Sequence, residues 1–211
     1  MEHRPLIPDI LIMRPVVAFF LLLTCVPSYA HARRELIATS TEGQEDSNVK
    51  KKDIVGRELE LFRTIKVSIR AALAAAQSLH AGSRVVDVSF DGASGTPVYR
   101  VKTYRGNQVW DDAIDANSGA VVGGTIISLV TDLTREDQTN LIALNDVRQE
   151  IADGIVVAER NAQGRAISGG LMNEDGKLNF VIVVVAGNDL KQFILEPPHA
   201  ASRDSRLRSR R

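Results

Sequence analysis

The sequence contains one cysteine, few aromatic residues and no excess of either charge. Cys25 is the single cysteine among 211 residues, so the chain cannot form an internal disulfide bond. Cys25 also lies in an apolar N-terminal run, and removal of that run would exclude thiol nucleophiles and zinc–thiolate sites. The 26 basic and 26 acidic residues balance, which does not indicate nucleic acid or an anionic membrane as the main partner.

Sequence patterns of catalysis and cofactor binding are also missing. The 4 histidines form no pair with metal-ligand spacing, and no Ser-His-Asp set can be assembled. The glycine pairs 123–124 and 169–170 lack the strand-to-helix context of a phosphate loop, which favours flexible joints or bulges. We therefore predict a non-enzymatic protein with no catalytic residue, no cofactor and no metal.

The N-terminal region has the layout of a secretory signal peptide. From Met13 it reads "MRPVVAFFLLLTCVPSYAHA", with a cationic start, an apolar run, a proline and then small residues. The apolar run is about half of the roughly 20 residues that a membrane-spanning helix needs. We predict a signal peptide at residues 1–32, with translation starting at Met13 and cleavage after Ala30 or Ala32, and hence a periplasmic or secreted protein.

A polar segment separates the leader from the first periodic region. Residues 33–56 alternate acidic and basic runs without an apolar face, which predicts a disordered linker. Beyond it, apolar side chains recur every three or four residues and predict one amphipathic helix. These side chains are Leu61, Ile65, Ile69, Leu73, Ala76 and Leu79.

A period of two follows the helix and predicts strands. Residues 86–90 and 98–104 alternate between apolar and polar side chains, and a turn at 105–107 leads into a further strand at 108–114. The first unit, residues 57–126, is therefore expected to be one helix on a three- to four-stranded antiparallel sheet.

The same order of elements recurs later in the chain. A second apolar helical face carries Leu144, Val147, Ile151, Ile155 and Ala158. Thr134, three residues before Asp137, predicts a helix N-cap upstream. Strands are expected at 165–171, 178–185 and 190–195, so we predict a second unit at residues 127–198.

The two units match at one common offset. Gly95, Tyr99, Gly106 and Asn107 correspond to Gly176, Phe180, Gly187 and Asn188, which indicates an internal duplication. The alternative is that unrelated hairpins share turn glycines. After the second unit, residues 199–211 form a basic tail, "RDSRLRSRR" within it, which predicts disorder and weak contact with anionic surfaces.

The first unit resembles a PepSY domain. The resemblance is carried by "SIRAALAAAQSLHAGSRVVDVSF" and "TPVYRVKTYRGNQVWDDAIDANSGAVVGG", and its most specific part is "IDANSGAVV" at 114–122. Residues 141–197 resemble a second, diverged copy, in which Glu196-Pro197-Pro198 replaces the Asp-to-Gly turn. The resemblance implies an α+β fold in exported bacterial proteins, no catalytic residues, and a role in peptidase inhibition or regulation, because such domains occur in the propeptides of thermolysin-like metalloproteases.

Three aspartates in "QVWDDAIDANSGAVVGG", residues 108–124, leave more than one reading. Asp111 and Asp112 should point to opposite faces of a strand, which disfavours paired acid–base catalysis. A calcium loop starting at Asp115 would place Gly119 at its fifth position and no acid at its twelfth. We expect Asp115 to close a turn in which Gly119 has a positive φ. A hydrolase or metal-binding protein that uses Asp111–Asp115 is the alternative function.

The favoured function is binding and modulation of a protein partner in the cell envelope or outside the cell, with a peptidase as one candidate. The partner-binding residues predicted are Trp110, Tyr104 and Asp112. A lone tryptophan on a strand is more often part of the core, so its role as an anchor depends on its being exposed. A partner strand added to a sheet edge is the other expected binding mode.

Overall fold

The computed structural model describes residues 55–93 and 95–198; the predicted signal peptide, nearly all of the predicted linker and the basic tail lie outside them. Seven strands form one antiparallel sheet in the order β4-β3-β2-β1-β5-β6-β7. The strands are β1 (Arg84–Asp91), β2 (Val98–Arg105), β3 (Gln108–Asp115), β4 (Val121–Leu129), β5 (Arg165–Glu174), β6 (Lys177–Ala186) and β7 (Asp189–Leu195). The α+β class predicted from the sequence is confirmed.

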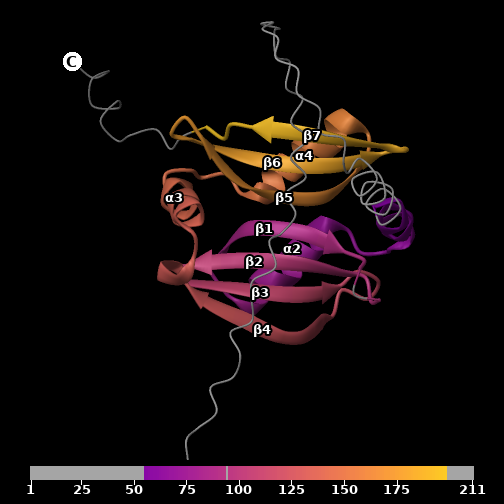
Figure 1. Cartoon of the computed structure of the whole chain (residues 1–211), viewed down its shortest axis with the longest axis horizontal. Helices are drawn as coiled ribbons and strands as arrows, with labels where there is room; N and C mark the ends of the chain where they lie inside the picture. Colours follow the sequence, from indigo (N-terminus) through magenta and orange to yellow (C-terminus); the bar gives the residue numbers. More distant parts are fainter. Residues whose placement is uncertain (1–54, 94, 199–211) are drawn as a thin grey trace, which may run out of the picture. The chain divides into compact units, whose positions relative to one another are not determined.

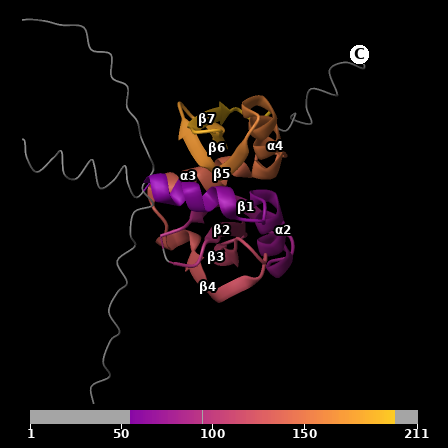
Figure 2. The ribbon, with the colours of Figure 1, turned by 90° about the vertical axis from the view of Figure 1, so that its right-hand side faces the viewer.

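Helices lie on both sides of this sheet. α2 (Ile69–Leu79) and α4 (Ile151–Ala162) pack on one face, and α3 (Arg135–Leu144) lies on the other side at one end (Figure 1; Figure 2). We call the face turned away from α2 and α4 the open face; it includes Asp87, Ser89, Arg100, Lys102 and Asp111. No helix among the described residues is long and apolar enough to span a bilayer.

The first predicted helix is divided in two. Residues 55–64 are helical, the chain then leaves the helix, and α2 begins at Ile69. The Ser68 side chain accepts a hydrogen bond from the Ala71 backbone N–H at 3.2 Å and caps the new helix. Ile65 and Ile69 are 4% and 1% exposed, so the apolar pattern continues through the break although the helix does not.

The second predicted helix is also shorter than expected. Leu144 ends α3, Val147 lies in the connection, and α4 begins only at Ile151. The cap predicted at Thr134 is confirmed, because its hydroxyl accepts a hydrogen bond from the Asp137 N–H at 3.1 Å. All three apolar side chains are buried, so burial rather than helical structure produced the periodic pattern.

A short ladder joins the two halves of the sheet. β1 and β5 pair at only three positions, where Asp87, Val88 and Ser89 face Gly170, Gly169 and Ser168. A side chain at Gly169 would meet Ile151 of α4 at 3.2 Å, and one at Gly170 would meet Asp87 Oδ1 at 3.3 Å. The glycine pair 169–170 therefore permits close packing in a regular ladder, and the register shift of β5 lies earlier, between Ala166 and Ser168.

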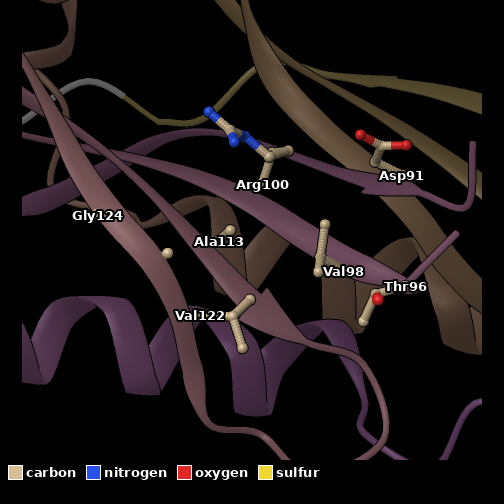
Figure 3. A pocket seen from close by; sticks show the side chains of 8 residues that line it. Asp91, Thr96, Val98, Arg100, Ala113, Val122 and Gly124 are labelled. Atoms are coloured by element: carbon tan, nitrogen blue, oxygen red, sulfur yellow. The ribbon is translucent and has the colours of Figure 1, made fainter. Parts of the chain in front are cut away.

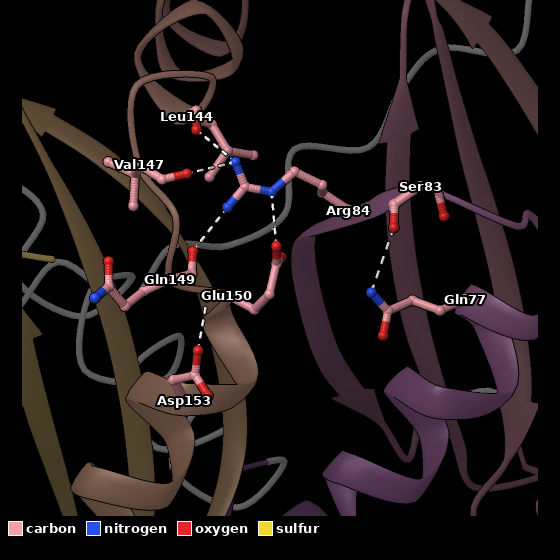
Figure 4. Close-up of polar contacts among 8 residues, drawn as sticks. All are labelled: Gln77, Ser83, Arg84, Leu144, Val147, Gln149, Glu150 and Asp153. Carbon is pink, nitrogen blue, oxygen red and sulfur yellow. Dashed lines mark hydrogen bonds and ion pairs between the residues drawn. The ribbon is translucent and has the colours of Figure 1, made fainter. Parts of the chain in front are cut away.

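Arg84 fastens the α3–α4 connection to the start of β1. Its guanidinium donates to the carbonyls of Leu144, Val147 and Gln149, and its Nε lies 2.9 Å from Glu150 Oε1 (Figure 4). Burial raises the pKa of the Glu150 carboxyl, while the neighbouring Arg84 lowers it. These bonds join the last carbonyl of α3 and two carbonyls of the α3–α4 connection to a single side chain.

Candidate functional site

The three aspartates of residues 108–124 occupy three different environments. Asp111 Oδ2 pairs with Arg100 Nη2 at 2.8 Å on the open face. Asp112 is 1% exposed and belongs to the face covered by α2. Since the two carboxylates point to opposite faces, the sequence-based prediction of their orientation is confirmed, and they cannot act together on one substrate atom.

Asp115 forms the predicted turn. Its Oδ1 accepts hydrogen bonds from the backbone N–H groups of Asn117 and Ser118 at 3.0 and 2.6 Å. The Ser118 backbone N–H is the main reason that the pKa of the Asp115 carboxyl is lowered, followed by the Ser118 hydroxyl. Gly119 has φ of 76°, as this turn requires. Asp115 is therefore engaged in local structure.

Asp112 links the end of α2 to β4. His80 Nε2 lies 2.8 Å from Asp112 Oδ2, and the Thr125 hydroxyl donates to Asp112 Oδ1 at 2.6 Å. Opposite Asp112, the β3–β4 ladder shifts register and Gly123 has φ of 73°. Residues 123–124, predicted as a flexible joint or a bulge, therefore lie in a bulge. The carboxylate thus ties the bulged part of β4 to the helix-covered side of the sheet.

Trp110 is packed between side chains rather than presented to solvent. The His80 ring stacks on it with centroids 4.5 Å apart and planes 12° apart, and the Arg105 guanidinium lies 5.7 Å from its centroid. The residue is 7% exposed. Trp110 is therefore not exposed, although its predicted role as an anchor for a partner required exposure.

The structure separates the three residues predicted to bind a partner. Trp110 and Asp112 lie together on the helix-covered face, where His80 contacts both. Tyr104 is paired with Val109 on the opposite, open face and is half-buried. Their role in partner binding stays a prediction.

The open face of the first half holds a shallow depression of about 480 Å³ (Figure 3). Its floor is formed by Val98, Ala113 and Val122, which come from three adjacent strands. Asp91 and Arg100 stand at its rim, and the depression is further lined by Thr96, Gly123 and Gly124. An apolar floor with a charged rim can receive one apolar side chain and orient its polar neighbours.

Asp87 is a second unusual carboxylate of the open face. Burial raises its pKa from 3.8 to about 6; Lys102 lowers it, and Asp111 and Asp137 raise it further. The residue is placed where β1 meets β5, against Gly170. The ionised carboxylate of Asp87 is therefore unfavourable at the junction between the two halves.

Metal binding and acid–base catalysis gain no support from this geometry. Within residues 55–93 and 95–198, no group of three or more His, Cys, Asp or Glu side chains could hold a metal ion. The carboxylates of Asp111, Asp112 and Asp115 each have a separate partner, as described above. The alternative function at Asp111–Asp115 is not favoured by their positions.

Sequence reasoning missed the roles of His80, Thr125 and Asp87. His80 and Asp112 are 32 residues apart, and the contact depends on how α2 docks on the sheet. Asp87 fits the alternation of its strand as an ordinary solvent-facing residue, and only the pairing of β1 with β5 buries it. The glycine pair 169–170 was the available signal, because glycine inside a strand often marks a close approach.

Comparison with known proteins agrees with the first half of this architecture. Residues 66–125 match the PepSY family model, described as the peptidase propeptide and YPEB domain. A comparison with curated proteins found no match. A crystal structure of a candidate lipoprotein from Clostridium difficile 630 matches with 17% identity and a TM-score of 0.37, over 64% of this chain and 91% of that one. A TM-score of this size supports no argument about function.

Proposed function

Residues 66–125 are a PepSY domain, and from this premise we propose that the protein is exported, is not an enzyme, and binds and modulates a protein partner in the envelope or outside the cell. The family description names peptidase propeptides, so a peptidase is the first partner to test. All the residues that line the depression lie within 66–125, the segment that matches the PepSY family model, which supports the proposal.

The observation that carries this proposal is the depression on the open face. Val98, Ala113 and Val122 offer an apolar floor (Figure 3). Both α2 and α4 lie on the other side of the sheet (Figure 2). We propose that an apolar side chain of the partner enters the depression while Arg100 and Asp91 contact polar groups around it. Aromatic and aliphatic anchors in such recesses contribute most of the affinity in many interfaces.

The three residues predicted from the sequence take different parts in this proposal. Tyr104 shares the open face and is proposed to contact the partner directly. Trp110 and Asp112 are proposed to act indirectly, because their contacts with His80 and Thr125 fix β3 and the bulge of β4 beside the depression. Export itself rests on the leader pattern, and N-terminal sequencing of the mature protein tests it.

The experiment is capture of partners from an envelope extract with two matched variants. Ala113→Gln fills the floor of the depression with a larger neutral side chain, whereas Ala74→Gln makes the same change on an exposed position of α2. We expect the wild type and Ala74→Gln to retain the same protein, identified by mass spectrometry, and Ala113→Gln to lose it at least tenfold. Equal recovery by both variants, with both folded, contradicts the proposed surface.

A purified candidate peptidase then tests modulation. We expect its activity on a protein substrate to change when the wild type is added and to change much less with Ala113→Gln. A peptidase that is unaffected by a bound wild-type protein contradicts the regulatory part of the proposal but not the binding part.

A further inference from the structure

β4 is an edge strand whose outer side pairs with no strand among the described residues. The sheet order places β4 at one edge and β7 at the other (Figure 1). Only β3 pairs with β4, and beyond the bulge the ladder is regular from Ile126 to Leu129. An edge strand of this kind presents unpaired N–H and C=O groups that can hydrogen-bond with another strand.

Large apolar side chains accompany these free backbone groups. The exposed fractions are 59% for Ile127, 49% for Ile126, 43% for Leu129 and 42% for Val121. Ile126 is paired with Asp111 and belongs to the open face, whereas Ile127 is paired with Trp110 and belongs to the other face. A strand added beside β4 would therefore bury apolar surface on both sides of the sheet.

β4 lacks the charges that usually protect an edge. Its sequence "VVGGTIISL" contains no Asp, Glu, Lys or Arg, and its bulge affects only the part around residues 123–125. The opposite edge differs, since β7 carries Asp189 and Lys191 and is followed by Glu196 and Pro197. Lysine and proline are among the residues with which natural proteins discourage edge pairing. β7 also exposes Leu190 and Ile194, at 44% and 51%, so charge and proline, rather than apolar exposure, distinguish the two edges.

We propose that β4 pairs antiparallel with β4 of a second copy of this chain, across a two-fold axis. The occupant is argued from charge: any register of β4 against itself brings together uncharged residues, so the pairing meets no like-charge repulsion. A two-fold contact is also closed, because each copy uses the one unprotected edge and leaves only charged β7 edges outside.

The dimer has a consequence for partner binding, and this step rests on the proposed function. A two-fold axis between antiparallel strands of one continuous sheet runs perpendicular to that sheet, so both open faces point to the same side. The two depressions lined by Val98, Ala113 and Val122 would then be presented together. A partner with two binding segments, or two partner molecules, would be held on one surface.

The test is sedimentation of the full chain over a range of concentrations, with a matched pair of variants. Ile127→Lys adds a charge to β4, and Ile142→Lys makes the same substitution on α3, where Ile142 is 68% exposed. We expect the wild type and Ile142→Lys to shift from monomer to dimer together, and Ile127→Lys to remain monomeric over at least a tenfold wider concentration range. Hydrogen exchange should show that those amides of residues 126–129 that point away from β3 become protected as the wild type dimerises.

Four results would overturn the proposal. These are a wild type that stays monomeric while its outward-pointing β4 amides remain unprotected, an Ile127→Lys variant that dimerises as the wild type does, assemblies that grow beyond the dimer, and protection of the outward-pointing β4 amides in a monomer. The last result would assign the edge to another segment of the same chain. Ala113→Gln should leave the dimer intact, so loss of partner capture and loss of dimerisation can be told apart.

Discussion

Replacement of Asp87 by asparagine tests whether the junction between β1 and β5 carries a costly charge. Burial raises the pKa of this carboxyl from 3.8 to about 6, and the attraction of Lys102 only partly opposes that rise. Gly170 leaves just enough room for the carboxylate, since a side chain there would approach Oδ1 to 3.3 Å. Asparagine keeps the shape of the side chain and removes the charge.

The sign follows from proton linkage. A carboxyl whose pKa is higher in the folded protein binds protons more tightly there, so its contribution to stability is full below pH 3.8 and is lost as the pH rises through about 6. The rise in the pKa of Asp87 from 3.8 to about 6 corresponds to at most about 3 kcal/mol, at about 1.36 kcal/mol per pKa unit. Since Asp87 is half-buried rather than enclosed, we expect about 1–2 kcal/mol.

The assay is urea unfolding of the wild type and Asp87→Asn at pH 4.5, 6 and 7.5. We expect the variant to gain about 1–2 kcal/mol relative to the wild type between the lowest and the highest pH, with most of the change complete by about pH 6. Asp189→Asn, on an exposed position at the start of β7, is the matched control and should show no such trend. Lys102→Gln should extend the change in stability to higher pH, because Lys102 lowers the pKa of Asp87 in the folded protein.

Two outcomes refute this reasoning. One is an Asp87→Asn variant whose stability relative to the wild type is the same at all three pH values. The other is a variant that is less stable than the wild type at pH 7.5, which would mean that the attraction between Asp87 and Lys102 outweighs the cost of burial.

Three further predictions concern stability. Arg84→Ala should lower the free energy of unfolding by about 3 kcal/mol or more in urea, because Glu150 loses its ion pair and three backbone carbonyls each lose a hydrogen bond. A loss below about 1 kcal/mol would contradict the role of Arg84 in holding the α3–α4 connection. His80→Ala and Thr125→Ala should each lower the free energy of unfolding by about 1–3 kcal/mol. If both side chains act through Asp112, the double variant should lose less than the sum of the two single losses. A double variant whose loss equals that sum would disprove the coupling. Gly164→Ala should lower the free energy of unfolding by several kcal/mol, because the added Cβ would lie 2.3 Å from the Val185 carbonyl oxygen. Gly124→Ala is the control and should change it by no more than about 0.5 kcal/mol, since a Cβ at Gly124 meets nothing within 4 Å. Equal shifts in melting temperature for the two variants would contradict the steric argument.

Local signals in the sequence predicted the hairpins well. Turns depend on a few adjacent residues, such as Gly106-Asn107 between β2 and β3 and Asp115 to Gly119 after β3. Strand alternation likewise separated Asp111 from Asp112 correctly, because it needs no knowledge of tertiary contacts. These predictions succeeded because turns and strand alternation are determined by residues that are close together in the sequence.

Helix ends were predicted less well, because burial was taken as a sign of helix. Ile65 and Val147 are both buried, yet neither belongs to a helix. At the first break the Val67 backbone is engaged by the sheet, where its N–H donates to the Ala116 carbonyl at 2.9 Å and its carbonyl accepts from the Tyr99 hydroxyl at 3.1 Å. Such long-range bonds override a periodic pattern, and only the Ser68 cap gave local notice of the break.

Joining of the two halves into one sheet was beyond the reach of the sequence. The strands were expected in two sheets, one in each unit. The segment "FVIVVV" in β6 is continuously apolar, a pattern typical of strands buried on both faces. In the structure, Phe180, Ile182 and Val184 are buried on the side of α4, while Val181 and Val183 stay only half-buried on the open face. Side-by-side joining leaves that face uncovered, which is why the candidate surface exists at all.

The junction itself shows how the halves depend on each other. Three residue pairs and a poorly solvated Asp87 form a weak ladder, so the ladder alone does not explain why one hydrophobic core runs through both halves. Phe62, in the helical segment 55–64, is 1% exposed and contacts Phe90 edge-to-face at 5.3 Å, while the Arg165 guanidinium lies 5.1 Å from its ring. Arg84 fastens the other end of the junction through the α3–α4 connection. These contacts connect β1 to the second half at both ends of the junction. We therefore expect the PepSY domain and the residues after it to unfold in one transition, and a substitution at either end of the junction to lower the stability of the strands that line the depression.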